Sequence, residues 1–335
     1  MMKLSRSLFA IAALALIPSM QADELKTEDV NAEALGFWHW DFTALRQSSI
    51  GKEFTAQIDL DRASINLQCP IRVVTGIDLR KDLQGSTVVV MGPRDGYAVL
   101  NGSFNQEAIV QAINSKLGAA AAGQGGDVAS WVWTIKGEKA GEATADACPM
   151  KGHGKWGGCQ GGELHLAFVK GKLLASFNAA SLTKGVDTLS GKSAAITADS
   201  TLISSVRKDL GSTFLSGAFG PAPEAFHKFH PMIAKYAGGS FVVGEKDGNF
   251  VAGGNANLSD EATSQQVLTM ANGFLAMGQM QAAQKPECVE MLKNVKLSAD
   301  GKIMNMEFTM AAADLIAKMK AGFAMRRDKM AAKAP

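Results

Sequence analysis

One pattern recurs four times along this chain and restricts its fold more than any other feature. Each copy has two short apolar segments joined by a tight turn, then a polar residue and a helical periodicity; the copies occupy 87–117, 164–189, 240–275 and 294–319. Asp-Gly between alternating apolar residues is typical of a β-hairpin, and a polar residue ahead of a helical periodicity is typical of a helix start. We therefore predict four units, each a hairpin followed by a helix.

The turns of these hairpins are expected at Arg94-Asp95-Gly96, Lys170-Gly171, Lys246-Asp247-Gly248 and Ala299-Asp300-Gly301. Asn178 and Ser259 are the residues expected to cap the helices of the second and third units. The predicted fold class is α+β: repeated antiparallel β-hairpin plus helix units, with the helices packed on one face of the sheet or sheets. The 35 glycines agree with many turns and argue against an all-helical fold.

The four units group into two halves. We predict a first α+β half over 23–150, with a glycine- and alanine-rich loop at 118–127, and a second over 160–324. A glycine-rich cysteine loop, 148–159, lies between them. The last residues, 325–335, are expected to form a basic flexible tail, because Arg and Lys outnumber the single Asp328 there and the apolar stripe of the preceding helix fades.

The N-terminal residues predict export. They comprise the basic residues Lys3 and Arg6, the apolar run 8–17, Pro18 and a small-residue cleavage site at 20–22. This is the layout of a secretory signal peptide, and the apolar run is far shorter than the ~20 residues that a spanning helix needs. We predict a signal peptide over 1–22, cleaved at Ala22, and an exported protein that does not span the membrane and is periplasmic or extracellular.

Charge and composition narrow the class of partner. Removal of Lys3 and Arg6 lowers the number of Lys and Arg from 34 to 32, which equals the 32 Asp and Glu. A chain without net charge has no broad electrostatic footprint for nucleic acid, so no nucleic-acid partner is expected. The basic tail would give only a weak attraction to the cell envelope, and the sequence does not identify another partner.

The cysteine loop has three interpretations: a disulfide, a metal site or free thiols. Cys148 and Cys159 flank four glycines and His153, and exported chains favour disulfides, so we predict a Cys148–Cys159 disulfide. Cys69 and Cys288 would then be able to form a second bridge. One alternative is a metal site, in which His153 and both thiols would need a fourth ligand.

Three other sets of residues are weaker candidates. His227 and His230 are spaced so that both would face one side of a helix and share a metal ion, although prolines crowd this stretch. Met277 and Met280 have a spacing that suits Cu(I), but methionine more often fills a core or lines an apolar groove. Two pairs of tryptophans, Trp38 with Trp40 and Trp131 with Trp133, would each point to one face of a strand, either as a ligand-binding platform or as core.

Segments 37–54, 73–92 and 166–192 resemble, in order and spacing, a group of uncharacterised exported proteins of planctomycete and verrucomicrobial bacteria. In that group a strand ending in Asp leads to a helix, a Gly-x-Asp-x-Arg-Lys-Asp-Leu segment precedes the first hairpin, and Leu-x-Gly-Lys follows the second. The resemblance covers most of 35–320 and implies no activity, because the group has none assigned. The Cys148–Cys159 segment is an insertion relative to that group.

No catalytic motif stands out. The sequence has no Gly-x-Ser-x-Gly elbow, no phosphate-binding Gly-x-x-x-x-Gly-Lys and no His-Glu-x-x-His, and no cofactor is expected. We therefore expect an exported, non-enzymatic binding or envelope-associated protein with an apolar groove between sheet and helices. A protein that handles zinc or copper through its Cys, His and Met residues is the alternative, and a hydrolase with a site assembled from scattered residues is a further one.

Overall fold

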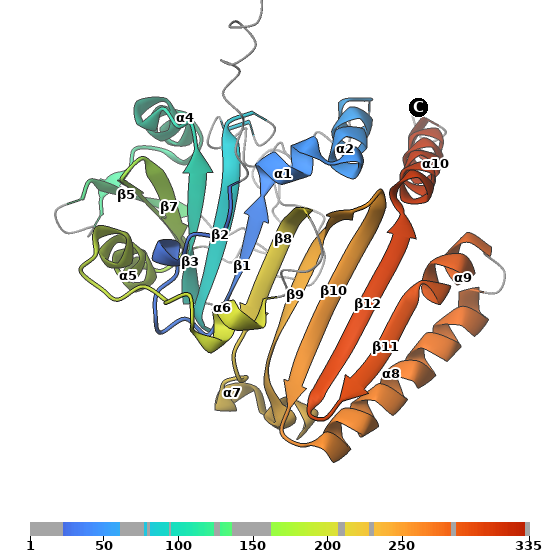
Figure 1. Cartoon of the computed structure of the whole chain (residues 1–335). Helices are drawn as coiled ribbons and strands as arrows, with labels where there is room; N and C mark the ends of the chain where they lie inside the picture. The colour runs from blue at the N-terminus through green and yellow to red at the C-terminus, as the bar shows by residue number, and fades with distance from the viewer. Residues whose placement is uncertain are drawn as a thin grey trace, which may run out of the picture.

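The chain is built around one antiparallel sheet, shown in Figure 1. The computed structural model describes residues 23–60, 77–78, 81–93, 95–123, 128–135, 162–206, 212–227, 231–282 and 286–331. Within them, the 12 strands have the order β11-β12-β10-β9-β8-β1-β2-β3-β7-β6-β5-β4, and every neighbouring pair is antiparallel. The α+β class predicted from the sequence is confirmed.

The strands are β1 Gly36–Asp41, β2 Leu83–Gly92, β3 Asp95–Gly102, β4 Ala121–Ala122, β5 Ser130–Ile135, β6 Gly162–Val169, β7 Lys172–Ser176, β8 Ser212–Phe219, β9 Tyr236–Lys246, β10 Asn249–Leu258, β11 Val295–Asp300 and β12 Ile303–Ala311. The helices are α1 Phe42–Gln47, α2 Ser49–Leu60, α4 Gln106–Leu117, α5 Ala179–Ser190, α6 Thr201–Ser205, α7 Glu224–His227, α8 Glu261–Gln281, α9 Pro286–Lys293 and α10 Ala312–Ala331. Two 3-10 turns, η1 Thr27–Asp29 and η2 Pro231–Lys235, complete the elements. None of the helices in the described ranges is both long and apolar enough to cross a membrane.

All four predicted hairpin-plus-helix units are present: β2–β3–α4, β6–β7–α5, β9–β10–α8 and β11–β12–α10. Two of the turns have positive φ at both central residues, 50° and 77° at Lys170 and Gly171, and 50° and 75° at Asp247 and Gly248. Paired positive φ values match the right-handed twist of the strands that such a turn joins. Local turn chemistry therefore fixes the hairpins.

The predicted cap of α5 is confirmed, and the predicted cap of α8 is wrong by one residue. Asn178 caps α5, since its side chain accepts hydrogen bonds from the N–H groups of Ala180 and Ser181. The cap of α8 is Asp260 and not Ser259: Asp260 Oδ1 accepts from the Thr263 N–H at 2.7 Å. Ser259 donates instead to Asp260 Oδ2 at 2.7 Å. A carboxylate at the start of the helix accepts a stronger hydrogen bond and also interacts favourably with the helix dipole.

One face of the sheet is apolar across its full width. Opposed residues in antiparallel strands point to the same face, so the registers define a continuous row. From β4 to β11 the row reads Ala122, Trp131, Leu166, Ala175, Ala98, Val88, Trp38, Gly217, Phe241, Gly254, Met306 and Leu297. No residue in this row is polar. We call the side of the sheet that carries it the apolar face.

The opposite face changes character along the sheet. Near β1 and β8 it carries the buried Phe37 and Ala218, but the same row continues through Ser240, Asn255, Asn305 and Ser298 on β9, β10, β12 and β11. A sheet with one apolar and one polar face is typical of half-buried antiparallel strands. Over β9 to β11, this row of the opposite face is therefore polar, although Val242, Val251 and Ile303 also lie on that face.

Two hydrophobic cores lie on opposite sides of the sheet. Val89, Val99 and Leu174 pack with Leu182 and Val186 of α5 on the opposite face. A second core forms on the apolar face under α4, from Ile109, Ile113, Trp133, Leu166 and Leu173. The sequence predicted helices on one face of the sheet. In the structure α4 and α5 instead cover different faces. At the other end of the sheet, α8 contacts β11, β12 and β10, and α10 contacts α2 (Figure 1).

Candidate apolar binding site

Aromatic rings form the floor of the apolar face at its centre. Phe219 is opposed by Gly36, and Phe241 is opposed by Gly217. A Cβ added at Gly36 would lie 2.4 Å from Phe219 Cδ1, and one at Gly217 would lie 2.6 Å from Phe241 Cε1. The rings therefore lie over the backbone of the neighbouring strand, in space that only glycine leaves open.

These rings form a contiguous aromatic surface. The Phe219 and Phe241 rings are stacked at 18° with centroids 6.3 Å apart, and Trp38 lies 6.3 Å from Phe219 at 38°. All three side chains are only half-buried. Aromatic side chains that are neither covered nor fully solvated provide a large area for contact with an apolar ligand.

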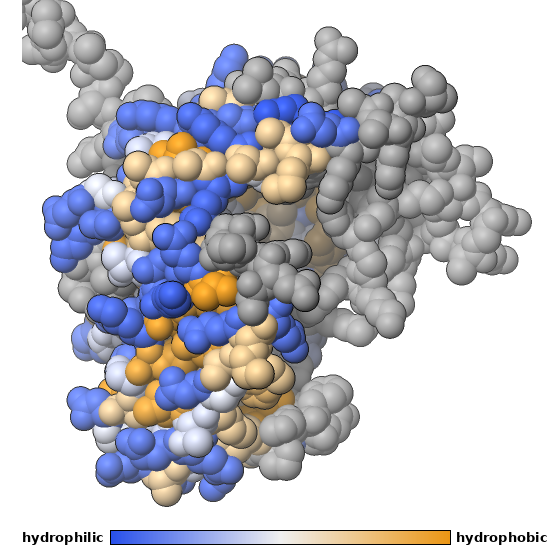
Figure 2. Space-filling view, turned by 90° about the vertical axis from the view of Figure 1, so that its right-hand side faces the viewer, coloured by the Kyte–Doolittle hydropathy of each residue, from blue (hydrophilic) through white to orange (hydrophobic). Residues whose placement is uncertain are grey.

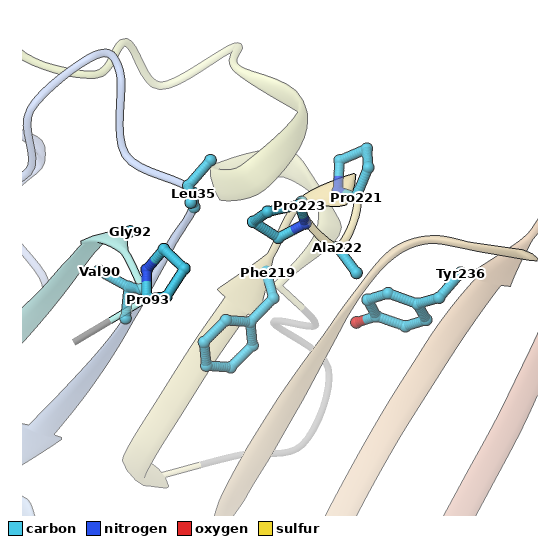
Figure 3. A pocket seen from close by; sticks show the side chains of 10 residues that line it. Leu35, Val90, Gly92, Pro93, Phe219, Pro221, Ala222, Pro223 and Tyr236 are labelled. Carbon is cyan, nitrogen blue, oxygen red and sulfur yellow. The ribbon is translucent and has the colours of Figure 1, made fainter. Parts of the chain in front are cut away.

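Two cavities flank this floor. The first, about 430 Å³, is lined by Trp38, Val88, Val89, Val90, Gly92, Asp95, Gly96, Tyr97, Ala98, Leu164, Ala175, Ser176, Phe177 and Asn178. The second, about 360 Å³, is lined by Leu35, Val90, Gly92, Pro93, Phe219, Gly220, Pro221, Ala222, Pro223 and Tyr236. They share Val90 and Gly92. Figure 3 shows the second cavity, with Phe219 between Val90 and Pro93 on one side and Tyr236 on the other.

The lining has little charge. Among the described residues the lining includes no Lys, Arg or His, and its one carboxylate, Asp95, accepts a hydrogen bond from the Ser181 hydroxyl. Ser176 Oγ donates to the Gly96 carbonyl at 2.7 Å and is thereby held by the backbone. Burial raises the pKa of both phenols, that of Tyr97 to about 12. The described lining is therefore mostly apolar and is suited to enclosing apolar groups.

All four predicted tryptophans lie on the apolar face, but their surroundings differ. Trp38 lines the first cavity, and its neighbour Trp40 stacks on Phe42 at 5.9 Å. Trp133 is 1% exposed and donates its indole N–H to Asn114 Oδ1 at 2.8 Å. Trp131 packs edge-to-face on Phe168 at 5.8 Å, in the core under α4. The structure thus brings Trp38 to the cavities and places the β5 pair in a core.

The two candidate methionines lie on the solvent side of α8. Met277 and Met280 are 48% and 77% exposed, and Phe274 beside them is 67% exposed. None of these residues lines either cavity described above. Figure 2, which views the molecule from the side of α8 and α9, shows apolar residues among hydrophilic ones on this side.

The metal and disulfide predictions fall mostly outside the described residues. Cys69, Cys148, His153, Cys159 and His230 lie there, and nothing is described of the Cys288 side chain. His227 donates from Nε2 to the Ala222 carbonyl at 2.9 Å. His165 Nε2 lies 3.1 Å from Glu163 Oε2. Within the described ranges, no three His, Cys, Asp or Glu side chains are grouped to hold a metal ion.

Sequence reasoning missed Phe219 and Phe241 as site residues. A usable signal was present, because both lie in strands where glycine alternates with apolar residues, in SGAFG and GGSFVVG. Glycine within a strand often marks a place where another group approaches the backbone closely. Here that group is the ring on the adjacent strand.

Comparison with known proteins gives a limited result. No family model matches the chain, and no curated protein matches it. Among solved structures, the chain is similar to three crystal forms of TP0453 from Treponema, at 7% identity and over 89% of its own length. Crystal forms III, I and IV are covered over 99%, 98% and 97% of their chains, with TM-scores of 0.46, 0.42 and 0.43.

Proposed function

We propose that this chain is an exported, non-enzymatic binding protein that holds an uncharged apolar group, such as the acyl chain of a lipid, on the apolar face of its sheet. The observation that carries the proposal is the unbroken apolar row, whose aromatic members Trp38 and Phe241 are half-buried and lie beside two cavities that share Val90 and Gly92 as lining residues. Export is supported by the signal-peptide pattern of residues 1–22. Ligand pockets are typically concave and mostly apolar, as these are.

Burial of a ligand here would be favourable for a simple reason. Trp38, Phe219 and Phe241 expose apolar area to water, and each buried CH₂ group of a ligand contributes about 0.8 kcal/mol. The lining residues that the structure describes include no Lys, Arg or His, so they give no counter-charge for an anionic group. The charged end of an amphipathic ligand would therefore remain outside, in water.

The test uses the neutral fluorescent probe N-phenyl-1-naphthylamine, together with lipid extraction and mass spectrometry of the protein purified from its native compartment. Val90 lines both cavities, so Val90→Asp should weaken probe binding about 10-fold or more, because an unpaired carboxylate would be placed in an apolar site. The matched control is Ile303→Asp, since Ile303 is 42% exposed and lies on the opposite face.

Both variants should retain the circular dichroism spectrum and melting temperature of the parent protein. Equal probe binding by parent and Val90→Asp, with both folded, would contradict the proposal. Equal loss of binding in the two variants would show that the probe does not distinguish the two faces of the sheet, and would also contradict it.

A further inference from the structure

A buried polar cluster surrounds Asp23 on the opposite face of the sheet. Asp23 is 7% exposed, and its carbonyl oxygen accepts a hydrogen bond from His39 Nε2 at 2.6 Å. A carbonyl only accepts, so Nε2 carries the proton, and Nδ1 accepts from Thr87 Oγ1 at 2.9 Å. Asn101 Nδ2 donates to Asp23 Oδ2 at 3.0 Å. Residue 23 is thus fixed from two sides.

The Asp23 side chain fits into space that Gly85 on β2 leaves open. A Cβ added at Gly85 would lie 1.8 Å from Asp23 Oδ2, so the carboxylate occupies the place of a side chain on β2. The other oxygen, Oδ1, lies 3.2 Å from Lys26 Nζ. Glycine at 85 is therefore required for residue 23 to dock.

Two oxygen atoms in this cluster have no hydrogen-bond donor. They are Asp29 Oδ2 and Asn101 Oδ1, and both are fully buried. The Asn101 amide cannot be rotated to correct this, because its NH₂ group would then leave the Asp23 carboxylate facing an amide oxygen. Buried acceptors without a donor are rare in folded proteins and point to a missing group.

The charges around the cluster are close to balanced. Asp23, Glu28 and Asp29 supply three carboxylates, Lys26 and Lys172 pair with them, and Lys170 also acts on Glu28. Lys172 contacts both Glu28, at 3.0 Å, and Asp29. Burial raises the pKa of the Asp29 carboxyl, as expected where compensation is incomplete. A group with several N–H donors would satisfy both buried oxygens.

We propose that the mature chain begins at Asp23 and that its new α-ammonium group is the missing donor. Hydrolysis of the Ala22–Asp23 bond by a protease of the signal-peptidase class would break the C–N bond, with water adding OH to the Ala22 carbonyl carbon and a proton to the Asp23 nitrogen. At neutral pH the amine gains a further proton from solvent and presents three donors. The nitrogen is one bond from the Asp23 Cα, and residue 23 is already held beside Asn101.

The docked residue also positions the segment that follows it, because Asp23 is held by His39 and Asn101. The processed terminus would then secure the segment 23–35, which continues into β1 and bonds to β2 through the Leu35 N–H and the Val90 carbonyl at 2.9 Å.

The experiment uses exported protein. Intact mass and N-terminal sequencing should give a chain that starts at Asp23. Acetylation with N-hydroxysuccinimidyl acetate at pH 7 should modify this amine about 10-fold more slowly in the folded protein than in urea, because a paired, buried ammonium is not nucleophilic. Asp29→Asn should remove most of this protection. Glu33→Gln, an exposed carboxylate of the same segment that pairs with Lys184, should leave it unchanged.

A second variant keeps the test decisive if Asp29→Asn does not fold. A glycine inserted between Ala22 and Asp23 would move the ammonium about 3.8 Å from its place, and should lower the melting temperature by several degrees. A different first residue, or equal acetylation rates in the folded and unfolded chains, would overturn the proposal. So would an unchanged melting temperature of the extended chain, which would mean that water alone fills the gap.

Discussion

At the scale of single residues, the apolar face depends on glycines as much as on aromatic rings. Phe241 can lie over β8 because Gly217 has no side chain, and the same relation holds between Phe219 and Gly36. Each ring covers backbone that would otherwise be open, and the Phe219 and Phe241 rings lie nearly parallel, at 18°. Gly36 and Gly217 therefore determine where the two aromatic rings of the site can lie.

Substitution of Gly217 tests this arrangement. In Gly217→Ala the new Cβ would lie 2.6 Å from Phe241 Cε1 and 2.8 Å from the Phe37 carbonyl oxygen, and the backbone oxygen cannot move aside. We expect a loss of about 1–3 kcal/mol in the free energy of unfolding, measured by urea titration. The control is Gly273→Ala on α8, where nothing lies within 4 Å, and where a gain of up to ~1 kcal/mol is expected. Equal effects at the two positions would contradict the packing described.

The chain has two tyrosines, which makes their ionisation directly measurable. Tyr97 is 2% exposed, donates to the Asp29 carbonyl at 3.1 Å and accepts from the Asn31 N–H at 3.0 Å. Burial raises its pKa to about 12, and the pKa of Tyr236 is raised as well. Absorbance at 295 nm in native protein should therefore show no phenol with the ordinary pKa of about 10.

The sign of the effect on stability follows from this shift. The folded state holds the Tyr97 proton above the pH at which the unfolded chain releases it, so the contribution is complete below about pH 10. It is lost as the pH rises towards 12, at up to about 1.4 kcal/mol per pH unit. Tyr97→Phe should lose about 1–2 kcal/mol at pH 7, because the Asn31 N–H loses its acceptor, and should remove this alkaline slope. An unchanged slope in the variant would assign it to another group.

At the scale of elements, α10 extends further than its sequence indicates. The sequence favours a flexible basic tail from 325, and on that basis deletion of 326–335 should leave the melting temperature almost unchanged. The helix instead runs to Ala331, and Arg327 Nη1 donates to Gln57 Oε1 on α2 at 3.1 Å. The ring centroid of Phe323 on α10 lies 6.4 Å from that of Phe54 on α2. The end of the chain therefore packs against an element near its beginning.

This contact changes the expected effect of mutations near the C-terminus. Gln57 is 6% exposed, so Arg327→Met would leave a nearly buried amide without this donor, at a cost of about 0.5–1.5 kcal/mol. For a chain of this size that corresponds to a fall of about 1–5 °C in the melting temperature. The neighbouring exposed residue gives the control, since Asp328→Asn should change it by less than about 1 °C. If both variants melt with the parent protein, the α2–α10 contact does not stabilise the fold.

At the scale of the whole molecule, the apolar row connects positions that are far apart in the sequence. Met306 on β12 is 49% exposed and lies in the same row as Trp38 on β1, four strand spacings or about 19 Å away. A ligand long enough to follow the row would contact both residues. Met306→Asp should therefore weaken binding of a long-chain fluorescent fatty alcohol but not of the short naphthylamine probe. Equal affinity of Met306→Asp and parent for the long probe would confine the site to the two cavities.

The hairpins and helices were predictable because their signals are local. Gly171 and Asp247-Gly248 adopt positive φ values that Gly and Asp tolerate, and Asn178 caps the helix that follows it. The sequence also placed Trp38 with Trp40, and Trp131 with Trp133, on one side of their strands, since alternation is a property of the strand itself.

What only the tertiary structure decided is which of these residues meet. The row from Ala122 to Leu297 depends on the order and register of twelve strands, and the cluster of Asp23, His39 and Asn101 joins segments 78 residues apart. Whether a tryptophan lies in a core or beside a cavity depends on what covers its strand, and α4 covers β5 while Trp38 lines a cavity. Periodicity determines the face of a residue, but contacts between distant segments determine its partners, and those contacts leave no local signal in the chain.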